Sequence, residues 1–175
     1  MANWNSNLLE VEGPQKDIDR MKKAVKGKES VFDFEKILPT PKELLASGSP
    51  QQDEATGKKF KDKYGATDWY VWRVKNWGTK WDLDPNGLDW YGNTLVFDSA
   101  WSPPASIIRF ISEQYPTLIF KLEYCEPCMS FAGNVEFKAG KTIVDDFTED
   151  THSELFKKCF QDLCGDWEQM FEGQE

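Results

Sequence analysis

A block of aromatic and cationic side chains near the middle of the chain could bind a planar or charged group. Four of the chain's 8 tryptophans fall within residues 69–81, where one arginine and two lysines lie between them. Aromatic faces beside cationic groups hold nucleobases, peptides or the anchor residues of partner proteins. Alternatively, the tryptophans pack a helix onto a sheet, since each brings a large apolar area to a core. The residues predicted to bind are Trp69, Trp72, Arg73, Trp77, Lys80 and Trp81.

Three aspartates near this block offer the carboxylates that acid–base or metal-assisted chemistry would need. Asp82, Asp84 and Asp98 could hold a divalent ion in a small hydrolase or nuclease, although aspartates are also ordinary turn formers. The sequence has no phosphate-binding glycine loop, no metalloprotease motif and no Gly-x-Ser-x-Gly elbow, and His152 is its only imidazole. We therefore expect no enzymatic activity and no cofactor, and keep a metal-dependent hydrolase as an alternative.

The four cysteines raise the question of zinc or redox chemistry. Cys125 and Cys128 have the two-residue spacing of a zinc half-site or a redox pair. Cys159 and Cys164 are five residues apart on a predicted helix, so they point to different faces and form no second half-site. A thioredoxin-type pair would open a helix after a strand, whereas this pair lies between two strand-like segments. We expect structural cysteines, with Cys125 and Cys128 as the alternative metal or redox residues.

Charge is distributed unevenly along the chain. The formal net charge is -9 at pH 7, which argues against a duplex DNA binder because such proteins need basic residues to displace phosphate counterions. Residues 142–175 hold ten acids against two lysines. The segment is either a solvated helix face or a docking surface for a basic partner, such as a nucleic-acid-binding protein. The predicted acidic partner surface comprises Asp145, Asp146, Glu149, Asp150 and Glu154.

Hydrophobic periodicity predicts the elements that position these residues. Asp68 caps a helix over 69–77 that ends at Gly78, and Tyr70, Val74 and Trp77 share one of its faces. Thr151 and Glu154 form a capping box for a last helix, which Gly165 interrupts or kinks. Strands are predicted at 7–12, 94–98, 118–124, 131–137 and 142–144, a short strand or extended arm at 31–34, and further helices after Pro14, at 42–46 and at 104–115.

This order of elements predicts one α+β domain spanning residues 1–175. Helices on one face of an antiparallel sheet, with split strand–helix–strand units, give a ferredoxin-like two-layer sandwich. The tryptophan-rich helix is inserted, a further helix lies at the C-terminus, and the polar residues 47–66 form a flexible loop. Residues 131–137 echo a strand of RNA-recognition modules, but Glu136 lies among the aromatics. Single-strand RNA binding is therefore an alternative that we do not expect.

Four segments together resemble a known family. Residues 1–13, 68–82, 97–104 and 124–133 are similar to blocks of the YubB-like, ferredoxin-like family carried by phages and plasmids. The resemblance covers most of residues 1–137, and its tryptophan-rich block is the most specific part. It implies a ferredoxin-like fold and an origin in a mobile element, and no particular chemistry. The family commonly has a cysteine where this chain has Asn5.

We therefore expect an accessory protein of a phage or mobile element that binds and inhibits a host protein. The target would be a defence or nucleic-acid-handling factor, with the acidic segment imitating a DNA backbone. No apolar run approaches the 18 residues that would span a bilayer, and no secretion signal opens the chain. These features predict no membrane partner and a location in the bacterial cytoplasm. The sequence leaves open whether the chain forms a homo-oligomer.

Overall fold

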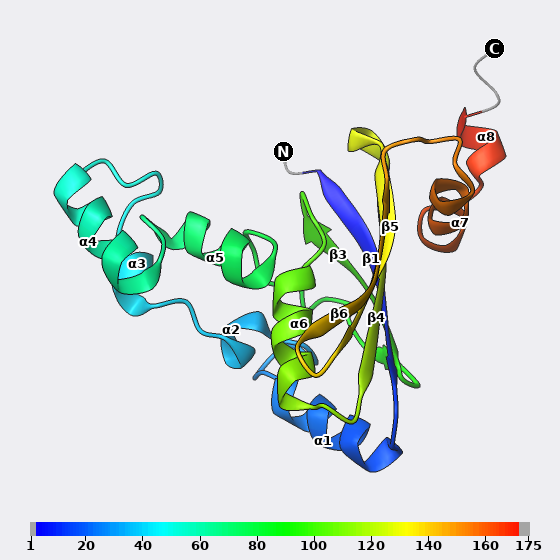
Figure 1. The fold of residues 1–175 in the computed structure, drawn as a ribbon, viewed down its shortest axis with the longest axis horizontal. Helices are drawn as coiled ribbons and strands as arrows, with labels where there is room; N and C mark the ends of the chain where they lie inside the picture. Colours follow the sequence, from blue (N-terminus) through cyan, green and yellow to red (C-terminus); the bar gives the residue numbers. More distant parts are fainter. Residues whose placement is uncertain (1–2, 172–175) are drawn as a thin grey trace.

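Six antiparallel strands form one sheet in the order β2-β3-β1-β4-β5-β6 (Figure 1). The structure is a computed structural model and describes residues 3–171. The connection from β3 through α6 to β4 passes over β1, which makes it the split strand–helix–strand unit that the sequence predicts. The predicted α+β class is confirmed. The strands are β1 (Trp4–Glu12), β2 (Trp90–Tyr91), β3 (Thr94–Ala100), β4 (Ile119–Glu126), β5 (Phe131–Lys138) and β6 (Lys141–Thr148).

Eight α-helices lie within the described residues. Helices α1 and α6 lie on one side of the sheet, and α7 and α8 on the other (Figure 1). None of these helices has the length and apolarity needed to cross a bilayer. The helices are α1 (Gln15–Val25), α2 (Phe34–Ile37), α3 (Lys42–Leu45), α4 (Glu54–Tyr64), α5 (Trp69–Trp77), α6 (Ala105–Gln114), α7 (Glu154–Leu163) and α8 (Trp167–Phe171), with a 3-10 turn at Pro127–Met129.

The two faces of the sheet carry separate hydrophobic cores. Along β4, Phe120 and Leu122 point into the larger core beneath α1 and α6. Cys125 points the opposite way, into a smaller core formed by Phe156 and Phe160 of α7 and Trp167 of α8. Since side chains alternate along a strand, one strand can serve both cores. The C-terminal helices therefore cover the face that α1 and α6 leave open.

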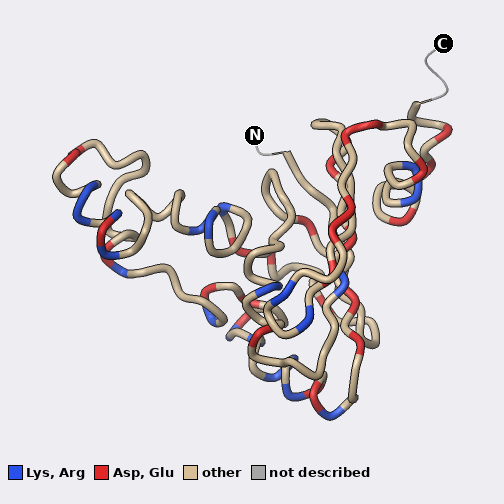
Figure 2. Tube along the Cα trace, viewed as in Figure 1, with Lys and Arg blue, Asp and Glu red and all other residues tan. Residues whose placement is uncertain are grey.

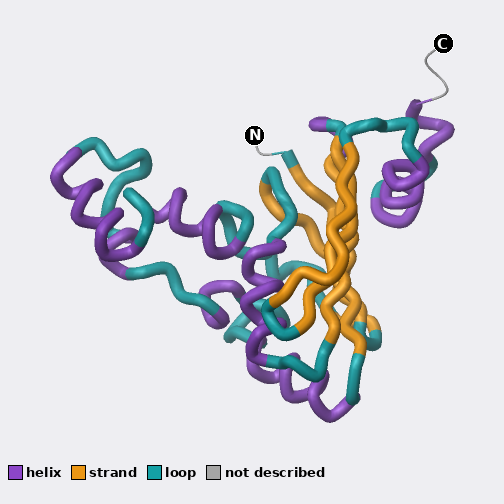
Figure 3. The backbone as a smooth tube through the Cα atoms, viewed as in Figure 1, coloured by secondary structure: helices purple, strands orange, loops and turns teal. Residues whose placement is uncertain are grey.

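Helices α3, α4 and α5 form an arm that extends away from the strands (Figure 3). The predicted loop at 47–66 is wrong over most of its length, because α4 occupies it. Asp53 caps this helix by accepting a hydrogen bond from the Thr56 amide, and Gly65 ends it in the left-handed conformation. Phe60 is its buried anchor. A single buried aromatic produces too little apolar periodicity for a helix to be recognised in a lysine-rich segment.

Two further local predictions are corrected, and a third agrees with the structure. The segment predicted as a strand or arm at 31–34 leads directly into α2, which begins at Phe34. The cap of α7 is Ser153, whose hydroxyl accepts from the Phe156 amide, and not Thr151. Gly165, with a φ of 126°, separates α7 from α8 and so interrupts the last helix as predicted. Both errors concern where a helix begins. Several neighbouring polar residues could accept a hydrogen bond from a free backbone amide there, and the sequence does not show which one does.

Candidate functional site

The inner part of the predicted binding block is structural. Trp77 is fully buried, and its indole Nε1–H donates to the Leu38 carbonyl oxygen at 2.9 Å. Its ring contacts Phe34 edge-on at 5.6 Å between centroids and Trp72 at 6.2 Å. Trp72 is also buried, whereas Tyr70 and Val74 are exposed. The predicted apolar face of α5 is therefore wrong, because α5 turns Trp72 and Trp77 together toward the core.

Arg73 joins three elements instead of facing a ligand. Its Nη2 lies 2.5 Å from Glu35 Oε1 of α2, and its Nε donates to Thr40 Oγ1 at 3.0 Å. The guanidinium carbon lies 4.5 Å from the Trp77 ring centroid and 5.2 Å from that of Trp69. These contacts engage Nε and Nη2 of the guanidinium and place the group beside two indole rings. Arg73 and Trp69 therefore stabilise the junction of the arm with α2.

The outer part of the block forms an exposed surface with two tryptophans that the sequence analysis did not include. The Trp4 and Trp81 rings contact each other at a tilt of 45° with 6.1 Å between centroids, and Lys80 Nζ lies 3.9 Å from the Trp81 centroid and 5.8 Å from that of Trp101. Trp4, Trp81 and Trp101 are 53%, 41% and 40% exposed. We call Trp4, Lys80, Trp81 and Trp101 the indole surface.

Strand pairing explains why two members of the indole surface were missed. Trp4 pairs with Ala100 in the β1–β3 register, which places it beside Trp101 although 97 positions separate the two. Trp101 has a φ of 72°, a conformation that few non-glycine residues adopt. No spacing in the sequence reveals this register, because it depends on which strands become neighbours.

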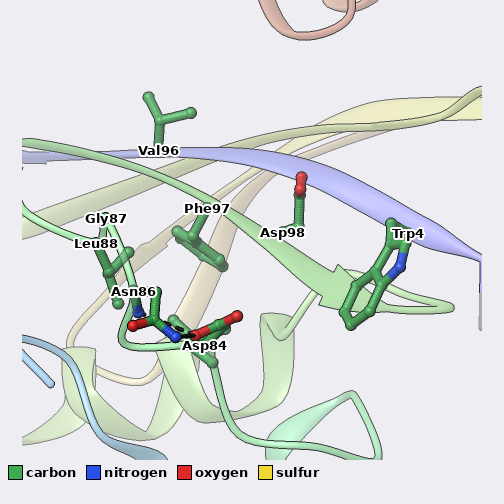
Figure 4. Close-up of a pocket in the computed structure, with 9 residues that line it drawn as sticks. Trp4, Asp84, Asn86, Gly87, Leu88, Val96, Phe97 and Asp98 are labelled. Atoms are coloured by element: carbon green, nitrogen blue, oxygen red, sulfur yellow. Dashed lines mark hydrogen bonds between the residues drawn. The ribbon is translucent and has the colours of Figure 1, made fainter. Parts of the chain in front are cut away.

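A groove adjoins the indole surface, between the edge of β3 and the loop that follows α5. Its volume is about 330 Å³, and its lining includes Trp4, Leu83, Asp84, Phe97 and Asp98. Figure 4 shows that Asp98 points to one side of β3, whereas Asp84 lies on the loop at the other side. The strand therefore separates two of the three aspartates proposed as alternative catalytic residues.

The third aspartate serves as a long-range helix cap. Asp82 accepts hydrogen bonds from the Phe34 and Glu35 amides at the start of α2, both at 3.0 Å, and from the Leu83 amide at 2.8 Å. Burial raises the pKa of its carboxyl above the ordinary value, against the lowering effect of these amides. A raised carboxyl pKa can mark a functional site, but here the amides occupy both oxygens. The role of Asp82 is to hold the loop against α2.

Asp84 and Asp98 accept hydrogen bonds from different partners and not from a shared group. Asp84 Oδ1 accepts from the backbone and side-chain nitrogens of Asn86, as in a turn. Asp98 Oδ1 accepts from the Ser6 hydroxyl at 2.9 Å across the β1–β3 pair. Within residues 3–171, no three His, Cys, Asp or Glu side chains are arranged to hold a metal ion. The geometry thus does not bring the three aspartates together.

The acidic residues of the C-terminal segment lie along one edge of the molecule but on both faces of the sheet. Asp145 pairs with Val135 and Asp146 with Asn134 in the β5–β6 register, so their side chains point to opposite sides. Glu149 and Asp150 lie in the connection to α7, and Glu154 lies in its first turn (Figure 2). Two further acids, Glu172 and Glu175, fall outside the described residues.

The cysteine pair with half-site spacing is separated by burial. Cys125 lies in the smaller core, whereas Cys128 is exposed on the 3-10 turn. The neighbouring Cys164 thiol raises the pKa of Cys125, and Cys125 in turn lowers the pKa of Cys164. Burial raises the pKa of Cys159 to about 12. Cys125 and Cys128 therefore do not act as a pair in this fold.

These environments predict which thiols react. Iodoacetamide at pH 8 is expected to modify Cys128 and Cys164 within minutes and to leave Cys125 and Cys159 unmodified, because the thiolate is the nucleophile. Peptide mass mapping after a timed quench measures the four sites separately. The same reaction in 8 M urea (a denaturing control) is expected to label all four. Rapid native labelling of Cys159 would show that the smaller core is open in solution.

Comparisons with known proteins agree with this architecture. A family model described as the ferredoxin-like domain in Api92-like protein matches residues 76–168. The crystal structure of a protein Api92 from Yersinia pseudotuberculosis has a TM-score of 0.52 and 14% identity to this chain, covering 87% of this chain and 99% of that one. A search of curated proteins found no match. The predicted ferredoxin-like fold is confirmed.

Proposed function

The chain belongs to the family with the ferredoxin-like domain of Api92-like proteins, and from that premise we propose that it binds a protein of the bacterial host and inhibits it. It acts without catalysis, in the host cytoplasm, as the product of a phage or other mobile element. The resemblance of four segments to the phage- and plasmid-borne YubB-like family supports that origin. The observation that carries the proposal is the indole surface.

The indole surface has the composition of a binding hot spot. Tryptophan anchors are enriched where truncation of a side chain weakens binding most, and they cluster with one another. Trp4 and Trp81 restrict each other through their ring contact, so less side-chain freedom is lost when a partner covers them. Lys80 adds a cation beside the rings. A partner that covered all three indoles would bury three tryptophans that are each at least 40% exposed.

The acidic residues on and after β6 have a secondary role in this proposal. Asp145 and Asp146 face opposite sides of the sheet, so a flat partner cannot contact both. Their charge nevertheless attracts a basic partner over a Debye length and raises the association rate. A target that handles nucleic acids would have the basic surface that this negative charge attracts. The acidic residues would imitate a DNA backbone only in part, because they do not lie on one face.

Affinity purification tests the proposal. The tagged chain is expected to retain one host protein from a bacterial lysate in stoichiometric amount and to inhibit it after purification. The Trp4→Ala, Trp81→Ala double variant is expected to bind that protein at least 30-fold more weakly, since a hot spot contributes about 2 kcal/mol or more. Tyr70→Ala, which removes an exposed aromatic from α5, is the matched control and is expected to bind normally.

Three outcomes count against the proposal. An empty eluate, equal retention by the double variant, or retention without inhibition of the purified target would each contradict it. Raising the salt concentration from 50 to 300 mM tests the acidic residues separately. Association that does not slow with salt would remove their steering role and leave the indole surface as the contact.

A further inference from the structure

We propose that the unpaired part of the β3 edge binds an extended, basic segment of the partner protein as an added β-strand. The added strand lies in the groove beside Asp84 and Asp98 and ends at the indole surface. This inference rests on the proposed function and specifies how the partner is recognised. Main-chain hydrogen bonds would supply affinity, and alternate side chains of the segment would supply specificity.

The hydrogen-bond phase of the β1–β3 ladder shows which backbone groups face the groove. At one end of the ladder the Trp101 amide donates to the Asn3 carbonyl, and at the other end the Val11 amide donates to the Asn93 carbonyl, both at 3.0 Å. Bonds in an antiparallel pair recur at every second residue. The odd-numbered residues of β3 therefore point their N–H and C=O groups toward β1, and the even-numbered residues point theirs outward.

Strand β2 covers only the beginning of this outward edge. It contains two residues, and its pairing reaches Thr94 and Leu95. At the other end, the Ala100 carbonyl accepts from the Thr79 hydroxyl at 2.8 Å. Between these points, no strand among residues 3–171 pairs with Val96 or Asp98 on this side of β3. An edge with unpaired groups is a template for another strand.

The groove beside this edge has room and apolar walls for such a strand. Its volume of about 330 Å³ is bounded by Leu83 of the loop and Phe97 of β3, both largely buried. Trp4 forms its end nearest the indole surface (Figure 4). A strand paired with Val96 and Asp98 would alternate its side chains between the two sides of β3. One set would meet Asp98 and the other would meet the loop that carries Asp84.

Charge complementarity selects a basic occupant. The charged residues that line the groove within the described chain are Asp84 and Asp98, one on each side of the strand. Asp98 is exposed and accepts one hydrogen bond, from Ser6, so its second oxygen is open to a cation. Arg or Lys on either face of the added strand would therefore pair with a carboxylate.

The same charges argue against a second copy of this chain as the occupant. Two copies paired through the same edge would bring the Asp98 carboxylates, and the adjacent Asp84 carboxylates, toward their counterparts. Like charges on directly opposed strand residues are destabilising. A basic segment of another protein has no such penalty.

Defined peptides test the proposal before the partner is identified. The probes are terminally blocked eight-residue peptides of alternating Thr and Val that carry either two Arg or two Glu residues. Fluorescence anisotropy measures their affinity, and ¹H–¹⁵N NMR reports the Val96 and Asp98 amides. The Arg peptide is expected to bind at least tenfold more tightly than the Glu peptide and to shift both amides. Equal affinity, or shifts confined to other residues, would overturn the proposal.

Backbone methylation of the peptide distinguishes strand addition from simple charge attraction. Two peptides are methylated at alternate backbone nitrogens. One lacks the N–H groups that would face β3, and the other lacks those that would face away from it. The first methylation is expected to weaken binding at least tenfold, and the second less than twofold. Equal effects of the two methylations would exclude a ladder with β3.

Two variants of Asp98 test the protein side. Asp98→Pro removes the edge N–H at a position where an edge strand tolerates proline, and Asp98→Lys reverses the charge. Each is expected to weaken the Arg peptide at least tenfold, with a cooperative thermal transition showing that the variant is folded. Asp62→Lys, at an exposed position of α4, is the charge control and is expected to bind within twofold of the original chain. A dimer that Asp98→Pro dissociates would overturn the proposal in favour of self-association.

These experiments distinguish a failure of this inference from a failure of the proposed function. If the host protein is lost with the Trp4→Ala, Trp81→Ala variant but retained by Asp98→Pro, the proposed function stands and strand addition is overturned. If the Arg peptide binds and only the first methylation weakens it, but no host protein is retained, the edge site stands and the proposed function is overturned.

Discussion

The Trp77→Ala variant is expected to unfold with a free energy about 3–5 kcal/mol below that of the original chain. Trp77 is completely buried, and its ring contacts Phe34, Trp72 and the guanidinium of Arg73. Removing the indole leaves a large cavity at the junction of the arm with the sheet domain. It also leaves the Leu38 carbonyl without its 2.9 Å hydrogen bond. Urea unfolding followed by far-ultraviolet circular dichroism measures the difference.

A second tryptophan of the same block provides the control for this prediction. Trp81 is 41% exposed, so Trp81→Ala is expected to change the free energy of unfolding by about 1 kcal/mol or less. The two variants remove the same side chain four positions apart. Equal losses would contradict the division of the block into a buried inner part and an exposed indole surface.

Replacing Arg73 by alanine is expected to destabilise the chain by about 2–3 kcal/mol. The guanidinium is 16% exposed and its partner Glu35 is 35% exposed, so solvent screening keeps the loss below that of a fully buried pair. The variant also leaves Thr40 without its 3.0 Å contact and removes the cation from the Trp77 ring. If Arg73 instead served a ligand, its removal would affect binding and not stability.

Two further variants show where the loss of stability in Arg73→Ala comes from. They are Arg73→Lys and Arg109→Ala. Lysine retains the charge but lacks the planar fork that reaches Glu35 and Thr40 together, so an intermediate loss is expected. Arg109 is exposed on α6, and its replacement by alanine is expected to change the free energy of unfolding by no more than about 0.5 kcal/mol. A double-mutant cycle with Glu35→Gln measures the coupling directly, and additive losses would contradict the ion pair.

The elements that carry strong local signals could be predicted from the sequence. Helix α5 begins after Asp68 and ends at Gly78 as predicted, because the carboxylate cap and the left-handed glycine act within one turn of the helix. The alternation of Leu95 with Phe97 likewise marked the buried face of β3. These signals depend on neighbours in sequence and do not depend on the rest of the fold.

The candidate site depends on neighbours in space and was predicted only in part. Lys80 and Trp81 are on the surface that the block predicted, but Trp4 and Trp101 reach it through the register of β1 with β3. Which face of α5 is buried depends on where α2 lies, and the helix sequence is apolar on several sides. Composition therefore identified a set of aromatic residues near the site. It did not distinguish the residues that are exposed there from those buried in the hydrophobic core.

The central position of β1 has a consequence for biosynthesis. This strand is translated well before its partners, which are β3, about 90 residues later, and β4, which ends at Glu126. A nascent chain must close both long loops before the middle of the sheet exists, and loop closure of this length opposes early pairing. On the ribosome, β1 therefore stays unpaired until β3 and β4 have been synthesised.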